Sequence, residues 1–144
     1  MHVEAVLRTK GTEVVTTAPD STLLDAARLL RFHRIGALVV TDEAGDVVGI
    51  LSERDVVSAV ADHGPDALSG PVSGVMTADV VRCAPGDTME QLMAAMTERR
   101  IRHLPVVDGT ALVGIVSIGD VVKRRVSEIQ DESQALQDYI TQGR

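Results

Sequence analysis

The stretch VGILSERDVV, residues 48–57, decides the fold because it returns as VGIVSIGDVV at residues 113–122. A second matching pair, APDST at 18–22 and APGDT at 84–88, lies upstream in the same order. Self-similarity at a fixed period, here about 66 residues, is typical of repeated structural units. The chain of 144 residues therefore holds two copies of one unit.

Each copy has the same order of predicted elements. A short apolar run before the proline, Val14–Thr16 or Val80–Cys83, is typical of a β-strand. A helix is expected after Thr22 and after Thr88, because each precedes an acidic or amide side chain by three residues, the spacing of a capping box. Two strands around a glycine-containing turn follow, and then a second helix. We expect these hairpin strands at Ala37–Thr41, Val47–Leu51, Leu104–Val107 and Leu112–Val116, and the second helices at Glu53–Ala61 and from Ile118 onward.

The sequence thus predicts an α/β (α+β) protein made of two βαββα repeats related by an approximate two-fold axis. Repeat 1 covers residues 1–61 and repeat 2 covers residues 72–126. Between them, residues 62–71 carry no hydrophobic period and contain glycine and proline breakers, which is typical of a linker.

The last segment, residues 127–144, is expected to form an amphipathic helix. Its apolar positions recur at alternating spacings of three and four residues, which places them on one face of a helix. This stripe consists of Val126, Ile129, Ser133, Leu136 and Ile140. The stripe predicts a homodimer in which the helix takes part, and packing of the helix against its own repeat is the alternative.

The overall composition narrows the class of protein. The chain is 44% hydrophobic and 24% charged, which is typical of a folded domain, and its formal net charge of -7 gives no general attraction to nucleic acid or anionic membrane. No apolar run approaches the length that spans a bilayer. The single cysteine, Cys83, cannot form an internal disulfide, so we expect a reducing, cytoplasmic setting with Cys83 as a buried strand residue.

Chemistry can be placed at the two strand-to-helix junctions. Ser52 and Asp55 lie at the first junction, and Ser117 and Asp120 lie at the second. The N-terminus of a helix offers free backbone N–H groups and the positive end of its dipole, which suit a phosphate. An aspartate one turn into the helix can accept both hydroxyls of a ribose. The same Ser-x-x-Asp spacing is also that of a capping box, which needs no ligand, and both interpretations can hold together.

The repeat, its proline-containing start and its Gly-hydrophobic-hydrophobic-Ser-x-x-Asp end resemble the cystathionine β-synthase (CBS) domain family, over about the first 125 residues. Domains of this family occur as tandem pairs called Bateman modules. The resemblance implies a regulatory module rather than an enzyme, with no catalytic cofactor and no metal. It implies binding of an adenosyl ligand such as AMP, ADP, ATP, NAD or S-adenosylmethionine in clefts between the repeats, and signalling to a separate enzyme or transporter. The ligand-binding residues expected on this basis are Ser52, Arg54, Asp55, Ser117, Asp120, Arg102, His103, Thr16, Ala18 and Ala37.

The two clefts are expected to differ. Repeat 2 carries the basic pair Arg102–His103 at the start of its second strand, where repeat 1 has the uncharged pair Gly36–Ala37. Repeat 1 in turn has Arg54 where repeat 2 has Gly119. We therefore predict the stronger phosphate attraction in the cleft of Arg102, with a merely solvated basic face as the alternative.

Catalysis has little support in the sequence. The four histidines show no metal-ligand spacing, and neither a nucleophile elbow nor a Gly-x-x-x-x-Gly-Lys phosphate loop occurs. Two other functions stay open. One is a structural or oligomerisation module with vestigial clefts, and the other is a nucleic-acid-associated regulator that uses the basic clusters Arg99–His103 and Lys123–Arg125.

Overall fold

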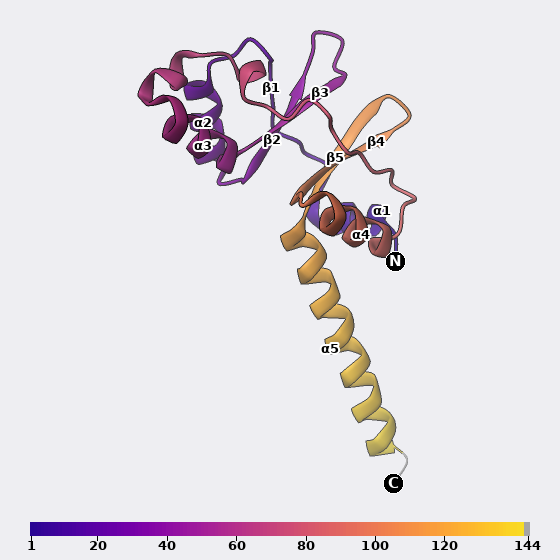
Figure 1. The fold of residues 1–144 in the computed structure, drawn as a ribbon. Helices are drawn as coiled ribbons and strands as arrows, with labels where there is room; N and C mark the ends of the chain where they lie inside the picture. The colour runs from indigo at the N-terminus through magenta and orange to yellow at the C-terminus, as the bar shows by residue number, and fades with distance from the viewer. Residues whose placement is uncertain (143–144) are drawn as a thin grey trace.

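The structure, a computed structural model, describes residues 1–142. Its first repeat forms a three-stranded sheet in the order β1-β2-β3, with β1 parallel to β2 and β2 antiparallel to β3 (Figure 1). Two helices complete the unit and enclose an aliphatic core. The elements are β1 (Thr16–Thr17), α2 (Leu23–His33), β2 (Ala37–Thr41), β3 (Val47–Ser52) and α3 (Glu53–His63).

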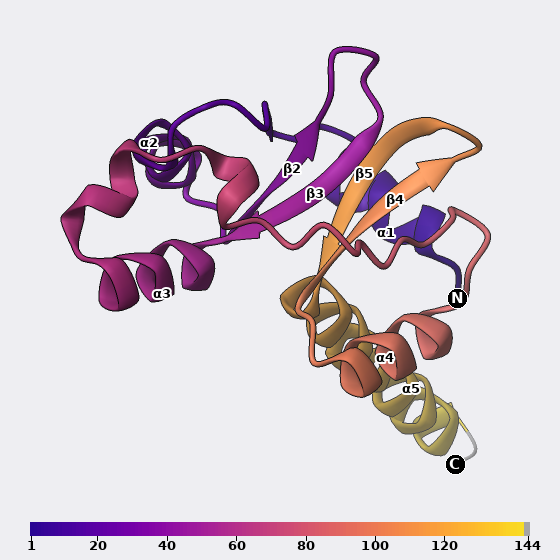
Figure 2. The ribbon, with the colours of Figure 1, turned by 45° about the horizontal axis from the view of Figure 1, so that its top comes forward.

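The second repeat has the same helix–hairpin–helix order and its own core. Its elements are α4 (Met89–Arg99), β4 (His103–Asp108), β5 (Ala111–Ser117) and α5 (Ile118–Gln142). Strands β4 and β5 pair antiparallel, and the two hairpins lie next to each other between the helices of the two repeats (Figures 1 and 2). The predicted fold class, an α+β protein of two repeats with a C-terminal helix, is confirmed.

The strand expected at Val80–Cys83 is reduced to a single parallel bridge between Cys83 and Val106. Proline explains the loss. In repeat 1 the Val39 N–H donates to the Val15 carbonyl at 3.4 Å, but the residue equivalent to Val39 in repeat 2 is Pro105, which has no N–H. The chain before Cys83 is therefore free to leave the sheet edge and to line the space between the repeats.

An N-terminal helix that the sequence analysis did not predict, α1 (Val3–Lys10), packs into the core of repeat 2. Val3, Val6 and Leu7 are at most 6% exposed there. The start of α1 is fixed by backbone bonds to the loop before α4, from the Val3 N–H to the carbonyl oxygen of Asp87 at 2.9 Å among others. The first ten residues thus begin repeat 1 in the chain but pack on repeat 2.

The segment that joins the two repeats and begins repeat 2 packs in the opposite direction, on repeat 1. It contains two short 3-10 helices, Pro65–Ser69 and Val72–Gly74, and the side chain of Val72 is fully buried in the core of repeat 1. The Val72 N–H donates to the Ser21 carbonyl at 2.8 Å. We use the term lead-in for residues 1–10 and 72–76, the first residues of each repeat. Each lead-in packs against the other repeat.

Helix α5 runs without a break from the second repeat into the C-terminal segment and projects away from the body of the protein (Figure 1). Residues 143–144, the end of the expected C-terminal helix, lie outside the described residues. Every residue from Ile129 to Gln142 is exposed, including the apolar stripe. Within residues 1–142, no helix combines the length and apolarity needed to cross a membrane.

Candidate functional site

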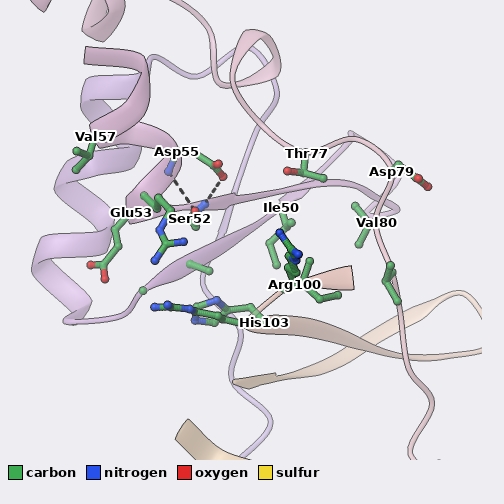
Figure 3. Close-up of a pocket in the computed structure, with 16 residues that line it drawn as sticks. Ile50, Ser52, Glu53, Asp55, Val57, Thr77, Asp79, Val80, Arg100 and His103 are labelled. Carbon is green, nitrogen blue, oxygen red and sulfur yellow. Dashed lines mark hydrogen bonds between the residues drawn. The ribbon is translucent and has the colours of Figure 1, made fainter. Parts of the chain in front are cut away.

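A cleft of about 580 Å³ lies between the two repeats, and we call it the Asp55 cleft (Figure 3). Four segments distant in sequence form its walls: the start of β2, the β3–α3 junction, the residues around the start of β4, and the stretch from Thr77 to Val81. Six predicted ligand-binding residues line it, namely Ala37, Ser52, Arg54, Asp55, Arg102 and His103. The cleft therefore combines the strand-to-helix junction of one repeat with the strand start of the other.

Ser52 and Asp55 form a complete capping box at the start of α3. The Ser52 N–H donates to Asp55 Oδ2 at 2.8 Å, and the Asp55 N–H donates to Ser52 Oγ at 3.1 Å. Within residues 1–142, Ser52 is the only residue that donates a hydrogen bond to the Asp55 carboxylate. Both readings of the Ser-x-x-Asp spacing are thus compatible, since the cap leaves acceptor capacity on a half-buried carboxylate at the cleft wall.

The sequence analysis placed Arg54 and Arg102 in different clefts, and this is wrong: both line the Asp55 cleft. The reason is geometric, because a cleft between two repeats takes one wall from each. The cleft is lined by equal numbers of basic and acidic residues. The basic residues are Arg54, Arg100 and Arg102, and the acidic residues are Glu53, Asp55 and Asp79. The cleft therefore offers both cationic groups for a phosphate and acceptors for hydroxyl or amino groups.

Arg100 enters the cleft because of how α4 ends. Arg100 is the C-terminal cap of α4 and has a left-handed backbone with φ of 53°, and Arg34 ends α2 in the same way with φ of 54°. Non-glycine residues are uncommon in this conformation. The left-handed turn reverses the chain toward β4 and directs the Arg100 side chain into the cleft (Figure 3).

His103 sits at the contact between the repeats. A Cβ on Gly36 would lie 3.2 Å from His103 Nε2, so the imidazole packs closely against this glycine. Burial lowers the pKa of His103, and the Lys10 and Arg102 cations lower it further, against the opposing effect of Asp120 and Glu53. The imidazole is therefore neutral near pH 7.

The second junction, which we call the Asp120 site, has the same capping box, but its aspartate accepts additional hydrogen bonds. Ser117 donates to Asp120 Oδ2 from its N–H at 2.8 Å and from its hydroxyl at 3.0 Å. Lys10 Nζ donates to the same oxygen at 2.5 Å. Burial alone would raise the pKa of Asp120, but the hydrogen bonds from Lys10 and Ser117 outweigh it and lower the pKa below its ordinary value.

Four predicted ligand-binding residues do not line the Asp55 cleft. Two of them, Ser117 and Asp120, form the Asp120 site. The other two lie on repeat 1: Thr16 is exposed in β1 and Ala18 is half-buried just after it.

Sequence reasoning missed one wall of the cleft and one of its arginines. Thr77, Asp79, Val80, Val81 and Arg100 line the Asp55 cleft but were not assigned to it. For Arg100, the signal was its match to Arg34 across the repeat period. The wall at residues 77–81 follows from Pro105, which does not allow a full strand there.

Cys83 does not line the cleft, and the structure shows no metal site in the residues that it describes. Cys83 is buried and has no disulfide partner; burial, helped by the Asp87 charge, raises the pKa of its thiol to about 12. Among residues 1–142, no group of three or more His, Cys, Asp or Glu side chains is arranged to hold a metal ion.

Comparison with known proteins identifies the family. The model of the CBS domain matches the chain twice, at residues 3–62 and 72–127. The chain belongs to the CBS domain family. A solved CBS-domain protein from Agrobacterium tumefaciens is 51% identical to it, with a TM-score of 0.83, over 86% of this chain and 92% of that one. The resemblance inferred from the repeat is thereby confirmed.

Two similar structures were solved with ligands. The CBS domain pair of MJ0100, in complex with 5-methylthioadenosine and S-adenosyl-L-methionine, is 25% identical, with a TM-score of 0.80, over 89% of this chain and 98% of that one. A CBS domain protein from Pyrobaculum aerophilum complexed with AMP is 27% identical, with a TM-score of 0.75, over 83% of this chain and 89% of that one. The three ligands have an adenosine group in common.

Proposed function

We propose that this protein is a regulatory module that binds an adenosyl ligand in the Asp55 cleft and signals its presence to a separate enzyme or transporter, without catalysing a reaction itself. The observation that carries the proposal is the convergence, in one cleft of about 580 Å³, of a ribose acceptor, a helix N-terminus and three arginines. This volume lies within the range of small-molecule sites. The adenosine-containing ligands of two relatives support the same class of ligand.

Each part of such a ligand has a suitable counterpart in the cleft. The Asp55 carboxylate can accept from the two hydroxyls of a ribose, while the arginines and the N-terminus of α3 can receive a phosphate. The aliphatic side chains of Ile50, Val80 and Ile101 offer an apolar surface for the base. The cleft also joins both repeats, so a ligand that contacts both walls can shift their relative arrangement, which a partner can then distinguish.

Calorimetric titration with AMP, ATP, NAD and S-adenosylmethionine tests the proposal. We expect at least one ligand to bind, and Asp55→Asn to weaken it by about ten- to a hundred-fold, the loss of a charge-assisted hydrogen bond. Asparagine keeps an acceptor for the Ser52 N–H, so the cap of α3 survives. The matched control is Asp62→Asn, an exposed position on the same helix. No binding by any of the four ligands, or equal affinity in Asp55→Asn, contradicts the proposal.

The same proposal includes a homodimer through α5. The last turns of α5 are exposed along the whole stripe, with Ile129 at 51%, Leu136 at 60% and Ile140 at 53%. A helical segment of this length is marginal in water without packing partners. Along α5 the basic cluster Lys123–Arg125 comes before the acidic residues Asp131, Glu132 and Asp138, so a second copy in antiparallel orientation brings unlike charges together. Light scattering of a chain ended after Arg125 tests this, and an unchanged dimer mass rules out α5 as the dimer contact.

A further inference from the structure

The Asp120 carboxylate is occupied by the chain itself. Its Oδ2 accepts three hydrogen bonds, two from Ser117 and one from Lys10 Nζ at 2.5 Å. Lys10 Nζ also donates to the Ile115 carbonyl at 2.9 Å. The two charged side chains are partly covered, with 33% of Lys10 and 22% of Asp120 exposed. An ammonium group therefore holds the carboxylate that the repeat makes equivalent to Asp55.

The matching position in the Asp55 cleft is satisfied in another way. Ile50, the equivalent of Ile115, exchanges two backbone hydrogen bonds of 3.0 Å with Thr77. No lysine takes part there, and within residues 1–142 the carboxylate of Asp55 accepts only from Ser52. In repeat 1 the main chain of Thr77 therefore pairs with Ile50 and leaves Asp55 available. In repeat 2 the Lys10 side chain donates to both the Ile115 carbonyl and Asp120.

The geometry of α1 explains why Lys10 reaches this place. A Cβ on Gly114 would lie 2.6 Å from Leu7 Cδ2, so this glycine allows α1 to lie directly on β5. Lys10 is three residues after Leu7 and therefore on the same face of the helix. Helix α1 ends at Lys10, and Gly11 follows with a positive φ of 102°. Lys10 is thus positioned by a buried helix rather than by a loose terminus.

We propose that Lys10 restricts this protein to one adenosyl ligand per chain by occupying the ribose acceptor of the Asp120 site. This inference rests on the proposed function of the Asp55 cleft. A ligand at the Asp120 site has to displace the ammonium from Asp120 and from Ile115, and Gly119 offers no side chain there to compensate. The Asp55 cleft presents no such competitor and has Arg54 in place of Gly119.

The stoichiometry of binding tests the inference. We compare the wild type, Lys10→Met, Asp55→Asn and Lys10→Met/Asp55→Asn by calorimetry with AMP and with S-adenosylmethionine. We expect one site in the wild type, two in Lys10→Met, and one remaining site in the double variant. Lys123→Met, which removes a lysine charge from an exposed position on α5, is the control and should keep one site.

The outcomes separate this inference from the proposed function. Two sites of similar affinity in the wild type, or a single site in Lys10→Met, overturn the role of Lys10 and leave the proposed function standing. Weaker binding in Lys10→Met also overturns it, because Lys10 would then be a contact of the ligand. Absence of binding in all four proteins overturns both.

A measurement without ligand checks where Lys10 lies in solution. His103 faces four charged groups, Lys10, Asp120, Glu53 and Arg102, and of these Lys10 holds its pKa down most strongly. Lys10→Met should therefore raise the pKa of His103 in an NMR titration, with the resonance assigned by His103→Gln. The Lys123→Met control should leave this pKa unchanged. An unchanged pKa in Lys10→Met means that the lysine is not seated beside Asp120, which overturns the inference.

Discussion

The Asp55 cleft and the Asp120 site start from closely matching sequences, VGILSERDVV and VGIVSIGDVV, and differ in what surrounds them. Both have a Ser-x-x-Asp capping box with the same backbone hydrogen bonds. In the Asp55 cleft the aspartate borders a space of about 580 Å³, whereas in the Asp120 site it is paired with Lys10. The motif therefore determines the cap of the helix but does not by itself determine whether the carboxylate is available.

The two lead-ins account for the difference. The lead-in of repeat 1 is a helix that presents Lys10 to Asp120. The lead-in of repeat 2 ends near Met76 and continues as residues 77–81, which line the Asp55 cleft. A junction that is repeated within one chain can thus have its aspartate available in one copy and ion-paired in the other, depending on a few residues that are distant from it in sequence.

Removal of the packing that holds α1 should have the largest effect. Leu7 is 6% exposed in the core of repeat 2, so Leu7→Ala should lower the free energy of unfolding by about 2–5 kcal/mol. Met76→Ala at the equivalent contact with Gly49 should cost less, because Met76 is only half-buried. Urea denaturation followed by circular dichroism measures both. Equal losses would show that the two lead-ins contribute alike and would remove this basis of the comparison.

Exchange of each aspartate for asparagine should separate the two sites in stability. Asp120→Asn leaves the ammonium of Lys10 without its carboxylate and should cost about 1–2 kcal/mol. Asp55→Asn keeps the cap of α3 and breaks no ion pair within residues 1–142, so its cost should be smaller. Chemical denaturation of the two variants without ligand gives the difference. The comparison fails if Asp55→Asn is the more destabilised of the two.

The arginines of the Asp55 cleft should act on one binding event. Arg54→Ala and Arg102→Ala should each weaken ATP by about three- to ten-fold, with a smaller loss for AMP, and the effect should shrink as salt rises because exposed charges are screened. Arg99→Ala, an exposed position at the end of α4 that does not line the cleft, is the control. If one of the two cleft variants leaves ATP affinity unchanged, that arginine belongs only to the solvated surface.

The smallest expected effect is on the dependence of stability on pH. The pKa of Asp120 is lowered in the folded protein, so its contribution is complete above the unfolded value of about 3.9 and is lost as the pH falls through the lower folded pKa. Lys10→Met removes part of this lowering. The free energy of unfolding of the wild type should therefore fall more than that of Lys10→Met in strongly acidic solution, by about 0.5–1 kcal/mol. Parallel acid profiles for the two proteins would contradict this.

Local features of the fold could be predicted from the sequence because they depend on neighbouring residues. The strand Ala37–Thr41 has the predicted bounds, and Thr22 and Thr88 cap the helices that follow them. Helix α1 was missed because its start lacks a side-chain cap: His2 makes none, and the helix is stabilised by Val3, Val6 and Leu7 packing on a repeat that begins far along the chain.

The sequence predicted residues of the candidate site, but not which of them meet in one cleft. Ser52 and Asp55 were identified from the motif, and they line the Asp55 cleft. That Arg102 joins Arg54 in this cleft depends on how the repeats face each other, which no local pattern encodes. The pairing of Lys10 with Asp120 spans 110 residues and belongs to the same class of long-range contacts.

The crossed lead-ins have a consequence for assembly. If the chain were cut between the repeats, each half would carry a segment shaped for the other and a core missing its own cover. Separate halves would meet only at their bulk concentration, whereas a covalent connection keeps them at a much higher effective concentration. Two copies of the same half would not supply each other's missing segment, because each lead-in fits the core of the other repeat. A tandem pair is the smallest unit in which each core receives its covering segment within one molecule.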